Sequence, residues 1–274
     1  MAKPNRPFSC VVACYNAAPY LGDCLESVIV QDYRPIEVVV VNDCSTDNFD
    51  KVIRKTRSSL KKHDVSLKVV SHSERLGYGT SMRDGTMASS GAFIGILDAD
   101  DVLMPGVISH VAGVYKRYRK ALYVYTQFMV CDTNLEERSI GWCRAPSRGE
   151  SILSCGLKGE HIYSHFKTFQ RFENMNDIFF EGCRTGCDQW MGLKLEERGP
   201  GVFTNFVGYK YRENLPGSIS RVHGTHRRAY WKKMLVKFVR NRRRRRSHKL
   251  VKPYPISFYD VTGAAVKIRS GGKG

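Results

Sequence analysis

The sequence lacks any uninterrupted apolar run approaching the roughly 18 residues that a membrane-spanning helix requires. Its opening segment, Met1 to Pro7, is polar and does not have the charged, apolar and cleavable regions of a secretory signal. Its nine cysteines are an odd number, and the closest late pair, Cys183 and Cys187, is not spaced as CxxC. These absences argue against a transmembrane segment, secretion, zinc binding and a disulfide framework. They predict a cytoplasmic protein with reduced thiols.

Acidic residues are missing from residues 221–249, a segment that holds thirteen of the 44 Lys and Arg residues. The whole chain carries a formal net charge of +18. Without this segment 31 basic residues face 26 acidic ones, so the rest of the chain is close to neutral. A basic segment beside a near-neutral domain predicts docking onto a polyanionic surface, either an anionic membrane leaflet or nucleic acid. A solvated terminal extension is the alternative.

Apolar runs rich in Val and Ile alternate with helix-like segments from Phe8 to about Ala121. Hydrophobic residues make up 42% of the 274 positions, which is enough for one large domain with or without an extension. The alternation predicts an α/β fold, a mostly parallel sheet flanked by helices. The expected strands are Phe8–Cys14, Ile36–Val41, Leu67–Ser71 and Ala92–Leu97, and the expected helices are Pro19–Gln31, Thr46–Lys62 (capped by Ser45 or Thr46) and Gly79–Ser89.

The second half of the chain is less regular. A strand is expected at Tyr123–Val130, and Asp132–Ala145 resembles a hairpin or loop. Asp188–Arg198 has helical spacing and is closed by Gly199-Pro200. Val202–Tyr211 reads as a strand followed by a turn-rich loop.

Polar side chains follow three of the expected strands: Tyr15-Asn16, Asn42-Asp43 and Asp98-Ala99-Asp100-Asp101. In parallel sheets wound with helices, ligands bind at the carboxyl ends of the strands. Three carboxylates within four residues repel one another, and a divalent cation such as Mg²⁺ or Mn²⁺ offsets that repulsion. An acidic loop or a helix N-cap is the alternative reading of the acidic run alone.

Four motifs in residues 8–105 resemble those of the family 2 glycosyltransferases, inverting enzymes with the nucleotide-sugar-binding GT-A fold. Val11–Asn16 resembles the opening strand of that family, and Glu37–Asp47 is similar to its VVDDGSTD segment. Arg75–Gly91 is similar to its N-x-G…A-R-N-x-G…A-x-G stretch, and Asp98–Asp101 resembles its DxD element. The motifs occur in the expected order and spacing, so the resemblance implies a GT-A domain.

The resemblance implies a nucleoside-diphosphate sugar as donor substrate. Asp43 would hydrogen-bond the base, Tyr15 and Asn16 would line the nucleoside pocket, and Arg83 would lie near the base and the phosphates. The sequence departs from the family motifs at three places, which bear on the preference for the nucleotide base more than on catalysis. A uridine diphosphate sugar is the default expectation. The departures are Asn42 in place of Asp, Ala13-Cys14 in place of Pro-Thr, and Asp84 in place of Asn.

The same resemblance assigns the acidic run to the metal and the diphosphate. Asp98 would contact the ribose or the metal, and Asp100 would ligate a Mn²⁺ or Mg²⁺ ion that bridges the diphosphate. The physical reason is that a cation offsets the charge that builds on the departing nucleoside diphosphate.

Inverting transfer also needs a carboxylate that takes the proton from the acceptor hydroxyl. Cys187–Gly199 is similar to the family's segment for this residue, with Cys187 where Glu is usual and Asp188 in the position of the base. Asp188 is therefore the expected catalytic base. An Asp that only caps the helix is the alternative.

Tyr211-Arg212 and Ser218-Ile219-Ser220 resemble the family's loop over the donor phosphates. Arg212, Ser218 and Ser220 are therefore expected to bind the donor, and an ordinary surface turn is the alternative.

Other candidate residues lie where relatives place the acceptor. His161, His165 and Lys167 receive only a weak acceptor-side role, since lone histidines are more often structural. Trp142 and Trp190 could stack on a sugar, but core packing is the expected role of both.

The expected domains are a GT-A domain at residues 1–222 (a nucleotide-sugar-binding half, 1–105, and an acceptor half, 106–222) and a basic extension at 223–274. Apolar residues from Tyr230 to Phe238 recur at helical spacing, which suits a membrane-surface helix or packing on the catalytic domain.

Two acceptors follow from the basic segment. One is a lipid-linked or cell-surface glycan at the inner membrane face, which the family favours. The other is a hydroxylated base of viral DNA. An inactive nucleotide-sugar-binding protein is a third hypothesis.

Overall fold

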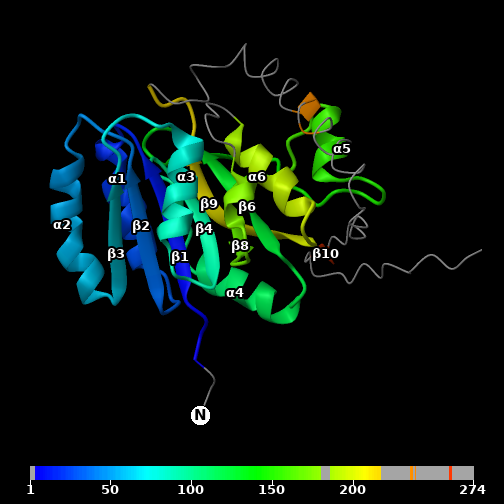
Figure 1. The fold of residues 1–274 in the computed structure, drawn as a ribbon, viewed down its shortest axis with the longest axis horizontal. Coiled ribbons are helices and arrows are strands. Elements are labelled where there is room, and N and C mark those ends of the chain that lie inside the picture. Colours follow the sequence, from blue (N-terminus) through cyan, green and yellow to red (C-terminus); the bar gives the residue numbers. More distant parts are fainter. Residues whose placement is uncertain (1–3, 180–185, 217–234, 237, 239–258, 261–274) are drawn as a thin grey trace, which may run out of the picture.

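The computed structural model describes residues 4–179, 186–216, 235, 236, 238, 259 and 260. These residues form one sheet with the strand order β10-β9-β6-β8-β4-β1-β2-β3, to which β5 adds beside β9 and β7 beside β6 (Figure 1). No helix in the described ranges is both long and apolar enough to cross a membrane.

The first half of the sheet is parallel, as the alternating pattern predicts. Strands β1, β2, β3 and β4 pair in parallel, with β1 at the centre between β2 and β4. The residues of β1, β2 and β4 are largely buried because helices cover them, and the Val and Ile runs supply that core, whereas β3 at the end of the sheet is mostly half-buried or exposed. The bounds are β1 (Phe8–Cys14), α1 (Ala18–Ile29), β2 (Ile36–Asn42), α2 (Phe49–Lys62), β3 (Val65–Ser71), α3 (Tyr78–Ala88) and β4 (Phe93–Asp98).

Helix α2 begins later than the sequence suggests. Its cap position is Asn48 instead of Ser45 or Thr46. The reason is that the preceding residues bind the loop after β1. The Thr46 backbone N–H donates to Asn16 (2.8 Å), and Asp47 accepts from the Ala18 N–H (2.8 Å).

The second half of the sheet is mixed. Strand β8 (Lys167–Gln170) runs antiparallel between β4 and β6, whereas β6 (Tyr123–Cys131) and β9 (Gly201–Arg212) pair in parallel. Strand β7 (Glu137–Ile140) folds back antiparallel on β6, so Asp132–Ala145, expected as a hairpin or loop, supplies the turn and the second strand of a hairpin whose first strand is β6. The remaining elements are β5 (Val102–Leu103), α4 (Val107–Arg117), α5 (Ile152–Leu157), the 3₁₀ helix η1 (Met175–Ile178), α6 (Cys187–Glu196) and β10 (Tyr259–Asp260).

Most of the extension expected at 223–274 lies outside the described residues, and so does the proposed boundary after residue 222. Two residues of its apolar stripe are described, and both are buried. The Phe238 ring packs edge-on against Trp190 of α6, at 5.4 Å between centroids. Phe238 therefore packs on α6 and Leu235 is buried, which agrees with the interpretation of the stripe as a packing surface.

Close packing of α3 on the sheet depends on a glycine. A Cβ added to Gly85 would lie 2.5 Å from Val11 Cγ1 and 2.8 Å from Val41 Cγ2. We expect Gly85→Ala to lower the free energy of unfolding by about 1–3 kcal/mol, because β1 and β2 must shift. The matched control is Gly113→Ala in α4, where an added Cβ meets nothing within 4 Å. That variant is expected to stabilise by about 0.5–1 kcal/mol, since Ala is the better helix former.

Urea denaturation of both variants would check this pair. Equal stabilities of Gly85→Ala and Gly113→Ala would contradict the packing of α3 described above.

Candidate active site

Three polar loops meet at one edge of the sheet because their strands are parallel and in register. Ala13 of β1 lies beside Val41 of β2 on one side and beside Asp98 of β4 on the other. The loops that begin at Tyr15, Asp43 and Asp98 therefore leave the same edge. The gathering of these residues predicted from the sequence is present in the structure.

In the loop after β1 the Tyr15 ring is exposed, and Asn16 makes hydrogen bonds to the loop after β2. Tyr15 is 39% exposed, and the Arg75 guanidinium lies 3.9 Å from its ring centroid. Asn16 exchanges hydrogen bonds with the loop after β2: its side chain accepts from the Thr46 N–H, and its own N–H donates to the Ser45 hydroxyl (3.1 Å). Tyr15 thus offers a stacking surface, whereas Asn16 holds two loops together.

Asp43 is buried and binds backbone N–H groups of the loop that precedes α3. Its two oxygens accept hydrogen bonds from the N–H groups of Leu76 and Gly77, each at 2.8 Å. The His72 Nδ1 atom lies 2.8 Å from the same carboxylate. Asp43 therefore fixes the loop that leads into α3, which is a structural use beside the expected contact with the base.

Arg83 belongs to the same network. Its Nε donates to Asp84 (2.8 Å), and the other oxygen of Asp84 lies 3.2 Å from His72 Nε2. The Arg83 side chain is one-quarter exposed. It lies on α3, at the edge where the expected donor would bind.

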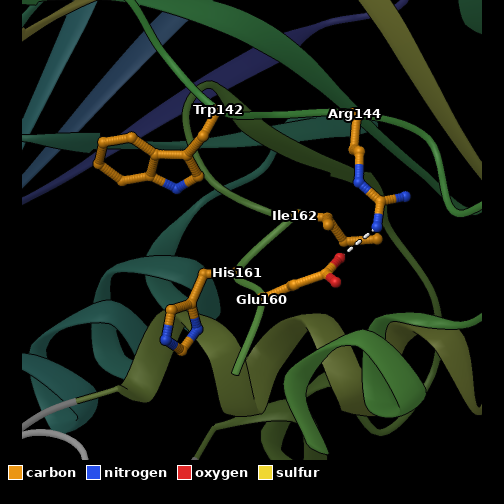
Figure 2. A pocket seen from close by; sticks show the side chains of 5 residues that line it. All are labelled: Trp142, Arg144, Glu160, His161 and Ile162. Atoms are coloured by element: carbon orange, nitrogen blue, oxygen red, sulfur yellow. Dashed lines mark hydrogen bonds and ion pairs between the residues drawn. The ribbon is translucent and has the colours of Figure 1, made fainter. Parts of the chain in front are cut away.

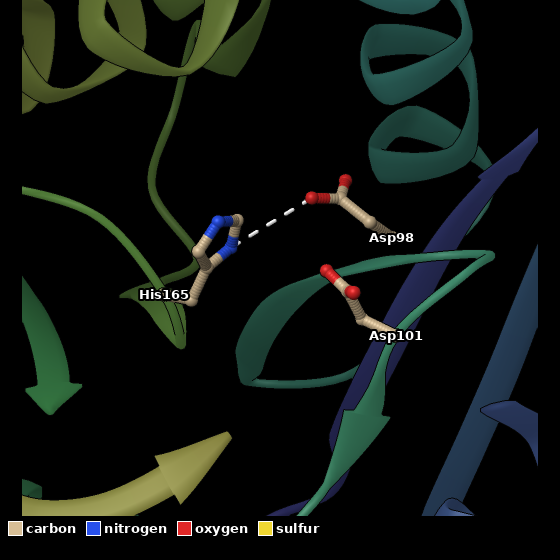
Figure 3. A group of neighbouring side chains, drawn as sticks. All are labelled: Asp98, Asp101 and His165. Atoms are coloured by element: carbon tan, nitrogen blue, oxygen red, sulfur yellow. Dashed lines mark ion pairs between the residues drawn. The ribbon is translucent and has the colours of Figure 1, made fainter. Parts of the chain in front are cut away.

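The acidic run after β4 gathers with a histidine that enters from the loop before β8 (Figure 3). Ligand atoms of Asp98, Asp101 and His165 lie within 4.8 Å of one another. Asp98 accepts a hydrogen bond from the Tyr78 hydroxyl (2.5 Å), and its other oxygen lies 3.7 Å from His165 Nδ1. Burial raises the pKa of Asp98, and the positive charge of Lys167 opposes this effect.

Asp101 is the least available of the three carboxylates. One oxygen accepts from the Arg212 N–H (2.7 Å) and the other from the Tyr209 hydroxyl (2.9 Å). Burial, together with the charges of Asp100 and Asp98, raises its pKa well above the ordinary range. Asp101 therefore joins the acidic run to β9.

Asp100 is half-buried, and in the described part of the chain no other side chain donates a hydrogen bond to its carboxylate. Burial, and then the charge of Asp98, raise its pKa to about 6, which the positive charge of Arg212 partly offsets. The carboxylates of Asp98 and Asp101 and the His165 imidazole form a donor set that fits Mn²⁺ or Mg²⁺, whereas Asp100, the expected metal ligand, lies outside that group. Burial and Lys167 lower the pKa of His165 well below its usual range, so its ring is neutral.

Arg212 is buried at the end of β9. Its guanidinium donates to the backbone oxygen of Asp100 (2.6 Å) and to the Asp23 carboxylate of α1 (2.5 Å). It also lies over the Tyr20 ring, 5.1 Å from the centroid. Arg212 therefore links the backbone of Asp100 to helix α1. Ser218 and Ser220, the other expected residues of the phosphate loop, lie outside the described residues.

Asp188 lies in the first turn of α6, but Gly186 occupies the cap position of that helix. One carboxylate oxygen of Asp188 lies 3.6 Å from the Lys167 ammonium, whose side chain is only 1% exposed. The charge of Asp188 raises the pKa of Asp98, and the charge of Lys167 lowers it. The expected base and Asp98 therefore both lie near enough to Lys167 to interact with its charge.

The two tryptophans differ in their surroundings. Trp190 is buried against Phe238, as core packing predicts. For Trp142 that expectation is wrong, because it follows β7 at the surface and is 49% exposed. Its ring lines a cavity of about 390 Å³ (Figure 2).

Several residues of the centre were not expected from the sequence. Tyr78 and Tyr209 bind the acidic run, and His72 bridges Asp43 and Asp84. His72 alone had a signal, since it follows β3 at the same sheet edge as the other loops. The two tyrosines come from a helix and from a strand distant in sequence, and no local pattern marks them.

The chain is similar to several known proteins. The family model described as glycosyl transferase family 2 matches residues 9–179. A chondroitin synthase from Escherichia coli is 26% identical over 204 residues, which cover 73% of this chain and 28% of that protein. The minor teichoic acid biosynthesis protein GgaB from Bacillus subtilis is 22% identical over 243 residues, 86% of this chain and 26% of that protein. The chain spans a third or less of the length of such relatives.

Solved structures with a similar fold include S. aureus TarS (residues 1–349) in complex with UDP-GlcNAc, with a TM-score of 0.63 and 21% identity. That likeness covers 78% of this chain and 60% of the other. The mannosyltransferase PcManGT from Pyrobaculum calidifontis, in complex with GDP-Man and Mn²⁺, has a TM-score of 0.57 and 19% identity, covering 79% and 59%. At these identities the likeness concerns the fold alone, and it confirms the expected GT-A arrangement.

Proposed function

Because the chain belongs to glycosyl transferase family 2, we propose that it moves a sugar from a nucleoside diphosphate to a hydroxyl group of a glycan. The observation that carries this proposal is the arrangement of three carboxylates around one centre. Asp98 ends β4 and Asp100 follows it, while Asp188 lies 3.6 Å from the Lys167 ammonium, whose charge also acts on Asp98. In this proposal Asp98 and Asp100 serve the diphosphate that leaves, and Asp188 serves the hydroxyl that attacks.

The donor is proposed to bind along the edge formed by the loops after β1, β2 and β4. Tyr15 offers its ring to the base, Asp43 a carboxylate oxygen and Arg83 a positive charge near the phosphates. A uridine diphosphate sugar is the proposed donor, and the fold likeness to a protein solved with UDP-GlcNAc supports it.

Asp98 and Asp100 would hold a divalent cation, Mn²⁺ or Mg²⁺, with His165 Nδ1 3.7 Å from Asp98. When bound, the cation supplies positive charge next to the diphosphate that leaves. Arg212 holds the backbone of Asp100 and is proposed to keep this carboxylate in place. The complex of PcManGT with Mn²⁺ supports the choice of a divalent cation.

Asp188 is proposed to accept the proton from the acceptor hydroxyl as that oxygen attacks the anomeric carbon from the far side, which inverts its configuration. The Lys167 ammonium, 3.6 Å from the Asp188 carboxylate, is proposed to hold this side chain in position.

We further propose that the acceptor is a lipid-linked or cell-surface glycan and that residues 221–249 dock on the anionic inner leaflet of a membrane. Relatives named for the synthesis of chondroitin, hyaluronan and teichoic acid support a glycan. The cysteines in the described residues are all free thiols, which supports a cytoplasmic setting. The same basic segment favours a second candidate, transfer of sugar to hydroxylated bases of DNA.

Release of nucleoside diphosphate tests these proposals. With Mn²⁺ and a panel of nucleotide sugars, we expect release that depends on a bacterial membrane extract and disappears on addition of a chelator. Release that requires hydroxymethylated duplex DNA would support the second candidate instead. Metal-dependent nucleotide binding without release in any pairing would contradict transferase activity and would favour a nucleotide-sugar-binding protein.

A further inference from the structure

The cavity beside Trp142 lies outside the centre described above and has two built walls (Figure 2). We call it the Trp142 pocket; it is lined by Trp142, Arg144, Glu160, His161 and Ile162. In Figure 2, Trp142 and Arg144 extend from one segment, and Glu160, His161 and Ile162 come from the other. Its volume of about 390 Å³ lies in the range of small-molecule sites.

The wall that carries Trp142 is held by buried side chains of β6. The Tyr125 hydroxyl donates to the Arg144 carbonyl (2.6 Å), and the Gln127 amide donates to the Cys143 carbonyl (3.0 Å). Gly141 permits a close approach, since a Cβ there would lie 2.4 Å from the Phe128 ring. The indole is therefore half exposed on a rigid support, which is the condition for a stacking platform.

The charges around the pocket are matched. The Arg144 guanidinium pairs with both Glu160 and Glu150, and Lys158 pairs with Glu150 at 2.8 Å. Among the described residues the two positive and two negative groups cancel, and His161 is the remaining titratable side chain of the lining, so little net charge is offered to a phosphate or a carboxylate. A half-exposed indole beside a carboxylate and a guanidinium suits a neutral sugar, whose ring face is apolar and whose hydroxyls both donate and accept hydrogen bonds.

The pocket is also close to the reacting centre. The Phe128 ring touches Trp142 on one side (4.9 Å between centroids) and His165 on the other (5.5 Å), and His165 lies 3.7 Å from Asp98. Ile162 and His165 are three positions apart in the chain, which limits the distance between their Cα atoms to about 11 Å. A glycan with more than one ring can therefore occupy the pocket and the centre together.

We infer that the Trp142 pocket binds a neutral sugar ring of the acceptor glycan, one that does not itself react. This inference rests on the proposed transfer to a glycan, and it adds the chemical class of the acceptor's neighbouring unit. Trp142 stacks on the ring face, while Glu160 and Arg144 bind its hydroxyls.

Binding to an array of neutral chito-, malto- and cello-oligosaccharides, without donor, tests the inference. We expect the unmodified protein and Trp142→Phe to bind at least one neutral series, and Trp142→Ala to bind it about tenfold more weakly or worse. Ile140→Ala is the matched control, because Ile140 is 53% exposed on the neighbouring strand and does not line the pocket. It should bind as the unmodified protein does.

Three results would overturn the inference: no neutral oligosaccharide bound, binding confined to acidic oligosaccharides, or equal binding by Trp142→Ala. Calorimetry with UDP and Mn²⁺ on the same variants separates this inference from the proposed function. Donor binding should be unchanged in Trp142→Ala. If the unmodified protein releases no nucleoside diphosphate, the transferase proposal is contradicted. The array result would still report on the pocket.

Discussion

Asp188→Asn is expected to lower kcat for sugar transfer by about 10²–10⁴-fold, the usual contribution of a general base. Asparagine preserves the size of the side chain but cannot take the proton from the acceptor hydroxyl. The Lys167 ammonium, 3.6 Å from the carboxylate and almost fully buried, would then lose a negative partner. Donor binding should persist, because the acidic run after β4 is intact. Steady-state kinetics and calorimetry with the nucleotide would measure the two effects separately.

The matched control is Asp177→Asn, which removes a carboxylate in η1 that pairs with Arg198 at the surface. Its kcat should stay within about twofold of the unmodified enzyme, since surface ion pairs contribute little. If Asp188→Asn retains full kcat, Asp188 is not the base, and another carboxylate must accept the proton.

Asp100→Asn is expected to lower kcat/KM by at least about 10²-fold and to weaken the response of the reaction to Mn²⁺. The carboxylate has a pKa of about 6 because burial and Asp98 both disfavour its charge. A group that is costly to ionise in the free protein is one that a bound cation would stabilise. The same reasoning predicts that, without metal, Asp100→Asn unfolds at a temperature no lower than the unmodified protein.

Opposite effects on activity and stability distinguish a functional carboxylate from a structural one. Asp50→Asn serves as control, because Asp50 is exposed in the first turn of α2, far along the chain from the acidic run. It should leave both the Mn²⁺ titration and the thermal unfolding unchanged. A large fall in the unfolding temperature of Asp100→Asn, with its Mn²⁺ response intact, would show that the carboxylate serves the fold.

The helices and strands of the first half follow from local pattern because β1, β2 and β4 are buried on both faces. Such strands are continuous apolar runs, and β1, β2 and β4 begin and end within one residue of the expected positions. The error at α2 has a tertiary cause. Thr46 and Asp47 can cap a helix, but their partners, Asn16 and Ala18, come from the loop after β1. A local pattern contains no information on that competition.

The second half was harder to predict because its elements pair across long stretches of chain. Strand β8 lies between β4 and β6, although it follows β6 in sequence by more than thirty residues. Its position brings Lys167 and His165 to the acidic run. The sequence indicates both residues only weakly, since neither lies in a motif with Asp98 or Asp188.

By itself, the sequence determined the parallel half of the sheet, the edge at which the polar loops gather and the acidic run after β4. These features depend on contiguous residues, and burial of a Val-rich strand leaves few alternatives. Only the tertiary structure decided that Arg212 supports Asp100, that Asp43 anchors the loop into α3, and that Trp142 is exposed beside a pocket. Each of these depends on partners far apart in the chain, whose distances are set by packing and not by local order.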